Sequence, residues 1–196
     1  MVGVSKGEAT RGAILDEASR LARRIGLGGL TIGSLATQTG MSKSGLFAHF
    51  GSKESLQLRV LEHSTERFTD EVIRPALKAP RGEPRLRDLF ERWLAWDSAE
   101  GGCPLVAASF ELDDQPGPVR DLLVRNQRDW TDTLATVFTS GVGEGQFRPD
   151  ADPRQFAQDV QGVMLAYHHT SRLLDDPGAA TRARRALDAL LAAATA

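Results

Sequence analysis

The stretch LTIGSLATQTGMSKSGLFAHF, residues 30–50, has the spacing of two short helices joined by a tight turn. Ala36 is small where the two helices would cross closely, and Gly40 falls four residues later, where the turn needs a positive φ. Leu46 follows six residues further on, at the inward face of the second helix. This combination of a small, a glycine and an apolar position predicts a helix-turn-helix.

The second helix of this pair has an outward face suited to DNA. Thr31, Ser42 and Ser52 stand where helix-capping residues are expected. With the apolar positions turned inward, the outward residues are Lys43, Ser44, Phe47 and Ala48. Gly45 lacks a side chain and would allow close backbone approach. A helix of this length spans about 12 Å, which fits the major groove of DNA.

Some side chains of this region have two readings. Phe47 could pack on the first helix instead of facing a groove, and His49 is either a phosphate donor or a solvated residue at a helix end. Lys6 and Arg11 form either a minor-groove arm or a disordered charged segment.

The charge of this region favours a polyanionic partner. Lys43 and Lys53 directly follow capping serines, and a cation at a helix N-terminus is unfavourable unless an anion lies there too. Residues 18–53 contain no Asp or Glu. At the chain's average of 26 acids in 196 residues, a stretch of this length would hold about five. We therefore expect the helix starts at Lys43 and Lys53 to meet phosphates.

The rest of the chain is also helical by pattern. Residues 14–25 form one amphipathic stretch that ends at Gly26. Further helical stretches are expected at residues 53–75, 86–100, 104–112, 119–140, 154–174 and 182–196. Since no segment shows sustained period-2 alternation, the predicted fold class is all-α.

Residues 10–56 as a whole resemble the DNA-binding domain of the TetR (tetracycline-repressor-like) family of transcriptional regulators. The later stretches EGQFRPDADPRQFA and SRLLDDP resemble the C-terminal half of that family. The resemblance implies an N-terminal three-helix helix-turn-helix domain, residues 1–56, and a helical ligand-binding and dimerisation domain, residues 57–196. It also implies a repressor that a small effector releases from a palindromic operator. All three Trp residues fall in the C-terminal half, which favours an apolar or aromatic effector.

The resemblance assigns roles to residues of the helix-turn-helix. Thr31 and Ser42 would donate to phosphates, and Lys53 would hold the DNA backbone. The groove-facing residues would be Lys43, Ser44, Gly45, Phe47 and Ala48. Relatives often carry Tyr at the position of Phe47, with a hydroxyl that bonds a phosphate. Phe47 lacks the hydroxyl, and its ring could instead pack on a thymine methyl group. Sequence readout would then depend on Lys43, apolar contacts and DNA shape.

In the family, the last two long helices pair with those of a second copy, which implies a homodimer. The apolar residues expected on these helices are Phe156, Val160, Val163, Met164, Tyr167, Ala186, Leu187, Leu190, Leu191 and Ala194, with Gly162 and Ala166 allowing close approach. Candidates to line an effector pocket are Trp93, Trp96, Cys103, Leu105, Phe110, Trp130, Phe138, Met164, Tyr167 and His168. Aromatic residues at helical spacing also serve as ordinary core, so both readings stay open.

Cys103, the single cysteine, excludes an intramolecular disulfide and a cysteine-based zinc cluster. It precedes Pro104 at an expected helix start, where a thiol pKa can fall, and it would then sense an oxidant or electrophile. Asp97 and Glu100 lie just upstream, and their negative charges would raise the pKa of the thiol. The alternative is a small apolar filler.

Composition and motifs exclude several other classes. The chain is 41% hydrophobic and 26% charged, without an apolar run near the roughly 18 residues of a membrane span or the apolar centre of a signal peptide, so we expect a cytoplasmic protein. It lacks a Gly-rich phosphate loop and an H-E-x-x-H motif, and His168 and His169 are adjacent. We expect that the protein is not an enzyme and that it binds neither a cofactor nor a metal. A DNA-binding autoregulator without an effector stays as a further alternative.

Overall fold

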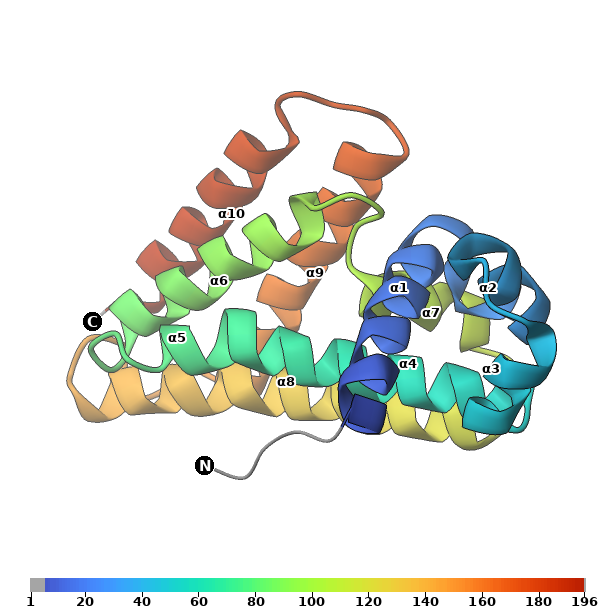
Figure 1. The fold of residues 1–196 in the computed structure, drawn as a ribbon. Helices are drawn as coiled ribbons and strands as arrows, with labels where there is room; N and C mark the ends of the chain where they lie inside the picture. The colour runs from blue at the N-terminus through green and yellow to red at the C-terminus, as the bar shows by residue number, and fades with distance from the viewer. Residues whose placement is uncertain (1–5, 196) are drawn as a thin grey trace. The chain divides into compact units, whose positions relative to one another are not determined.

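The computed structural model describes residues 6–195, with side chains from residue 10 onward. This part of the chain is helical, and apart from an isolated β-bridge between Phe147 and Thr195 it contains no strand. The elements are α1 (Lys6–Gly29), α2 (Ile32–Thr39), α3 (Lys43–Phe50), α4 (Lys53–Phe68), the π-helical turn η1 (Thr69–Ile73), α5 (Arg74–Ala76), α6 (Glu83–Ser98), α7 (Pro104–Leu112), α8 (Pro118–Gly143), α9 (Pro153–Arg172) and α10 (Ala179–Ala194) (Figure 1). The all-α class expected from the sequence is confirmed.

The chain divides into two compact units. The first consists of Met1–Arg67 and Cys103–Val124, and the second of Phe68–Gly102 and Arg125–Ala196. Helix α7 therefore belongs to the same unit as the helix-turn-helix, although more than fifty residues separate them in the sequence. The expected domain limit after residue 56 stays a prediction.

The core of the first unit follows the periodicity of α1, α2 and α3. Leu35 and Leu46 are fully buried, and Phe50 is nearly so, which holds α2 and α3 together. The α1 side chains in this core are Ile14, Ala18, Leu21 and Ala22. Ile25, expected on the same apolar face, is 44% exposed instead, because it is the last residue before the backbone leaves helical geometry at Gly26.

Aromatic side chains fill much of the second unit. The ring of Phe138 is stacked on those of Phe147 and Phe156, with centroids 4.5 and 4.3 Å away. Helices α9 and α10 run side by side and pack against each other (Figure 1). The β-bridge at Phe147 attaches the loop after α8 to the end of α10.

Candidate nucleic-acid interface

The ends of the short helices are capped by side chains, as the sequence predicts. The hydroxyl of Thr31 accepts a hydrogen bond from the backbone N–H of Ser34, and the Ser34 hydroxyl in turn accepts from the N–H of Thr31. Ser42 accepts from the N–H of Gly45 at 3.1 Å. Gly40 has a φ of 70°, which confirms the left-handed turn between α2 and α3. The caps and the turn fix the position of α3 relative to α2.

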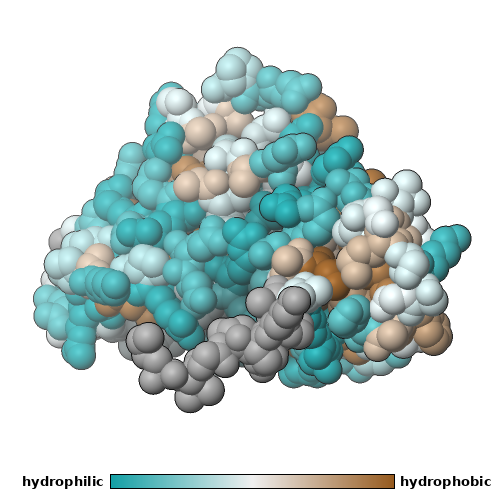
Figure 2. All heavy atoms as spheres, viewed as in Figure 1, coloured by the Kyte–Doolittle hydropathy of each residue, from teal (hydrophilic) through white to brown (hydrophobic). Residues whose placement is uncertain are grey.

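The outward face of α3 is open and carries few charges. Phe47 is 58% exposed, which favours the outward position over packing on α1. The other exposed side chains of this helix are Lys43, Ser44, Ala48 and His49. In Figure 2 the surface over α2 and α3 is white to tan, in contrast to the hydrophilic surface of much of the rest of this view. An exposed, weakly polar face on a short helix is suited to contacts with base edges and methyl groups.

The start of α3 lies close to the start of α2. A Cβ atom placed on Gly33 would lie 3.9 Å from Cε of Lys43 and 3.6 Å from the hydroxyl oxygen of Thr31. The side chain of Lys43 therefore extends along the N-terminus of α2. Free backbone N–H groups, a hydroxyl and an ammonium group come together there, which is the chemistry of a phosphate site.

Lys53 already has an intramolecular partner. Its ammonium group donates to the carbonyl oxygen of Gly28 at 2.7 Å, and the Gln57 side chain donates to the carbonyl oxygen of Leu27 at 2.6 Å. Both bonds join α4 to the end of α1. An ammonium group has three donors, so Lys53 retains hydrogens for a second acceptor.

Glu17 joins α1 to α2. Its carboxylate accepts hydrogen bonds from Gln38 at 2.9 Å and from Arg20. These bonds, with that of Gln38 the larger effect, hold the pKa of Glu17 below its usual value. The last acid before the acid-free region is thus engaged within the unit.

Of the two arm residues proposed from the sequence, Arg11 lies within α1 and is half-buried. The side chain of Lys6 is outside the described part of the chain.

The structure brings together some of the expected effector-binding residues. Trp93 and Tyr167 are buried with ring centroids 5.8 Å apart, and Phe68 contacts both Trp96 and Trp130. Met164 is also buried in this unit. These edge-to-face pairs bury the rings within the second unit.

An ionisable pair, a buried Asp97 and a partly buried His168, lies beside these aromatic residues. The carboxylate of Asp97 is buried and contacts Nδ1 of His168 at 2.7 Å. Burial, and to a smaller extent the charge of Asp97, raises the pKa of Tyr167. A polar pair next to aromatic rings offers one directional contact in an otherwise apolar environment.

Other expected effector-binding residues belong to the first unit. Cys103 and Leu105, at the start of α7, are buried, and Cys103 is its N-cap residue. Phe110, also on α7, is 65% exposed. These three residues belong to the first unit, whereas Trp93, Trp96, Trp130 and Tyr167 belong to the second.

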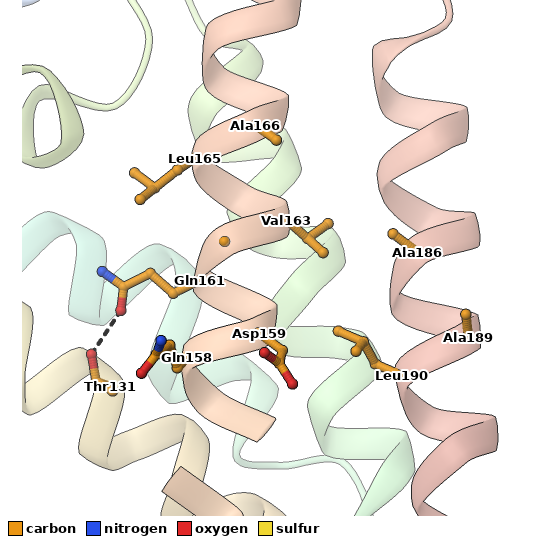
Figure 3. Close-up of a pocket in the computed structure, with 11 residues that line it drawn as sticks. Thr131, Gln158, Asp159, Gln161, Val163, Leu165, Ala166, Ala186, Ala189 and Leu190 are labelled. Carbon is orange, nitrogen blue, oxygen red and sulfur yellow. Dashed lines mark hydrogen bonds between the residues drawn. The ribbon is translucent and has the colours of Figure 1, made fainter. Parts of the chain in front are cut away.

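An open groove of about 1050 Å³ follows α9 and α10 (Figure 3). Its lining is mostly small or apolar and consists of Thr131, Gln158, Asp159, Gln161, Gly162, Val163, Leu165, Ala166, Ala186, Ala189 and Leu190. Thr131 donates to the side chain of Gln161 at one edge. Seven of the apolar residues expected on the partner-facing side are buried in the chain's own core instead: Phe156, Val160, Met164, Tyr167, Leu187, Leu191 and Ala194. They occupy the other side of each helix because α9 and α10 pack on each other.

No group of three or more His, Cys, Asp or Glu side chains in residues 10–195 is placed to hold a metal ion. Within the same range, no helix has the length and apolar content needed to cross a bilayer.

Comparison with protein families agrees with this geometry. The family model described as "Tetracyclin repressor-like, C-terminal domain" matches residues 82–187, more than half of the chain. The model "Bacterial regulatory proteins, tetR family" matches residues 14–60, which include α2 and α3. The chain belongs to the TetR family. It is therefore a DNA-binding transcriptional regulator with a helix-turn-helix, of a family whose members are generally not enzymes.

Solved structures of TetR-family regulators share the fold. One from Chloroflexus aurantiacus J-10-FL is 24% identical with a TM-score of 0.82, over 95% of this chain and 94% of that chain. A regulator from Saccharomonospora viridis in complex with choline is 23% identical with a TM-score of 0.81, over 95% and 96%. AibR, in complex with isovaleryl coenzyme A and operator DNA, is 21% identical with a TM-score of 0.69, over 93% and 96%. At these identities the similarity shows the fold alone. A search of curated proteins found no match.

Sequence patterns missed the contacts of this TetR-family chain that join distant residues. Glu111 of α7 accepts hydrogen bonds from the N–H groups of Leu27 and Gly28, and it was not among the expected site residues. The pairing of Asp97 with His168 was also missed. Local periodicity places residues on helices but gives no signal for such partners.

Proposed function

We propose that the chain is a homodimeric repressor that binds a palindromic operator through α3 and leaves it when a small apolar or aromatic effector binds. The observation that carries the proposal is the exposed, acid-free face of α3, held in place by the caps and turn of a helix-turn-helix. A short helix with this face fits the major groove.

The proposed DNA contacts have two kinds. Phosphates would be bound by the N-termini of α2 and α3 and by Lys53, and base edges would be contacted from the outward face of α3. The residues involved would be Thr31, Ser42, Lys43, Ser44, Gly45, Phe47, Ala48, His49 and Lys53. Phe47 and Ala48 lack hydrogen-bonding groups, so thymine methyl groups and DNA shape would carry much of the preference.

We assign the groove along α9 and α10 to a second copy of the chain. Gly162 and Ala166 are exposed in the single chain, and the half-buried Val163 and Leu190 lie beside them. Small residues allow helices to approach closely, and an apolar groove on a soluble chain is stabilised by a partner. The two copies of α3 would then face successive major grooves of a palindrome.

The proposed effector binds among the aromatic residues of the second unit. Trp93, Trp96, Trp130 and Tyr167 provide apolar rings, and the pair of Asp97 and His168 provides a polar contact. The ligands bound in two similar structures, choline and isovaleryl coenzyme A, differ widely in chemistry. Effector class therefore has to come from this chain's own residues, which favour an apolar or aromatic molecule. A protein that acts on genomic DNA would work in the cytoplasm.

The test is selection of duplexes from a random DNA pool by the purified chain, followed by sequencing. We expect an enriched palindrome, two chains bound to each duplex, and binding that weakens steeply as salt is raised. A pool without any enriched sequence, or binding that salt does not change, would contradict the proposal.

A further inference from the structure

The helical geometry of α1 is interrupted near its end, and a carboxylate that is distant in sequence binds the backbone there. Gly26 has a φ of 79° and a ψ of 161°, so the helix stops there and restarts for one turn at Leu27. The N–H groups at such a restart have no acceptor in their own helix. Glu111 of α7 supplies it, accepting from the N–H of Leu27 at 3.1 Å and of Gly28 at 2.6 Å.

The glycines of this turn allow the carboxylate to approach. A Cβ atom on Gly26 would lie 2.6 Å from Oε1 of Glu111, and one on Gly28 would lie 3.0 Å from Oε2. Any side chain at position 26 would displace the carboxylate and would also be strained at this φ. The sequence GLGG therefore ends the helix and also forms the binding site for the Glu111 carboxylate.

The same turn is bound from its other side by α4. The carbonyl oxygens of Leu27 and Gly28 accept hydrogen bonds from Gln57 and Lys53. Side chains from two helices thus hold both the N–H and the C=O groups of one short turn. Thr31, the cap of α2, follows three residues after Gly28.

We propose that Glu111 is a positioning residue, through which the position of α7 sets the position of α2 and α3 on DNA. Glu111 lies in the part of the chain that matches the C-terminal, regulatory family model, yet it belongs to the compact unit of the helix-turn-helix. A shift of α7 would release the N–H groups of Leu27 and Gly28 and loosen the segment that leads into α2. This inference rests on the proposed DNA binding by α3.

For the removal of Glu111, electrostatics and the positioning role predict opposite changes in DNA affinity. Removing an acid from a unit that binds a polyanion should strengthen binding. If Glu111 acts by positioning, Glu111→Ala should weaken binding about tenfold while leaving the slope of log K against log salt unchanged, because no phosphate contact is lost. Glu111→Gln keeps the length of the side chain and one acceptor oxygen, so its affinity for DNA should fall between those of the wild type and Glu111→Ala.

The experiment measures two properties of the full chain. The first is binding to the duplex that the wild type selects, with Asp114→Ala as the control, since Asp114 is an exposed acid close to the end of α7. The second is amide hydrogen exchange at Leu27 and Gly28, which should be about tenfold faster in Glu111→Ala than in wild type or Asp114→Ala.

Wild-type affinity in Glu111→Ala, or tighter binding, would overturn the positioning role. Failure of the wild type to bind any duplex would instead contradict the proposed function. In that case exchange at Leu27 and Gly28 still tests the contact, and unchanged rates in Glu111→Ala would overturn it too.

Discussion

Lys43 and Lys53 occupy equivalent places at helix starts but have different surroundings. Lys43 extends along the N-terminus of α2, next to the outward face of α3, whereas Lys53 donates to Gly28. We expect Lys53→Ala to weaken binding to all duplexes about equally and Lys43→Ala also to reduce the preference for the selected site. Each change should lower the salt slope by about 0.9 if it removes one phosphate contact.

Titrations of both variants at several salt concentrations, on the selected duplex and on a random one, check this. Lys78→Ala, at an exposed lysine of the second unit, is the control. Identical profiles for the two helix-start variants would contradict the roles assigned. An unchanged slope in Lys53→Ala would mean that this lysine serves only to hold Gly28.

Cys103 is 1% exposed, at the N-cap of α7. Burial limits access to oxidants, so the apolar-filler reading predicts that Cys103→Ser keeps the response of DNA binding to effectors and to peroxide the same as in wild type. The measurement is DNA affinity before and after mild peroxide treatment. Wild-type binding that peroxide abolishes, with binding by Cys103→Ser unaffected, would establish the sensor alternative instead.

At the scale of elements, the turn between α2 and α3 depends on backbone geometry alone. A Cβ atom on Gly40 would meet nothing within 4 Å, but φ there is 70°. We expect Gly40→Ala to lower the free energy of unfolding by about 1–2 kcal/mol, the cost of a left-handed residue. Gly12→Ala is the matched control, since it also meets nothing but lies in helical geometry, and should raise the free energy by about 0.5–1 kcal/mol.

Urea unfolding of both variants measures these differences, provided that the slope with denaturant stays constant. Equal effects of the two substitutions would show that the turn tolerates a side chain, against the geometry of α2 and α3.

The elements were predictable from sequence where the signal is local. The caps at Thr31 and Ser42 and the positive φ of Gly40 each depend on a few neighbouring residues, and the helices after α1 fall close to the expected ranges. Helix α1 instead begins at Lys6, well before the expected start at residue 14. The exposure of Ile25 and the bond from Glu111 to Gly28 were not predictable, because each depends on contacts or a backbone break outside the helical period. For α9 and α10, periodicity identified apolar helices but not which side meets the chain's own core.

At the scale of the whole molecule, the groove along α9 and α10 should join two chains. Ala166→Glu places a charge among its apolar residues, so we expect a monomer and at least a tenfold loss of affinity for the palindrome. Thr181→Glu adds the same charge to an exposed position of α10 that does not line the groove. This control should change neither the oligomeric state nor the affinity for the palindrome. Analytical ultracentrifugation with DNA titration gives both quantities. A dimeric Ala166→Glu would place the interface elsewhere.

The central claim is that two copies of α3, at a fixed separation, read the two halves of one palindrome. Affinity for the selected palindrome, compared with the same palindrome carrying ~5 extra base pairs at its centre, tests it most directly, because half a helical turn moves the half-sites to opposite faces of the duplex. The account predicts that the insertion lowers affinity at least about a hundredfold, to the level of a single half-site. Equal affinity for both duplexes would contradict it.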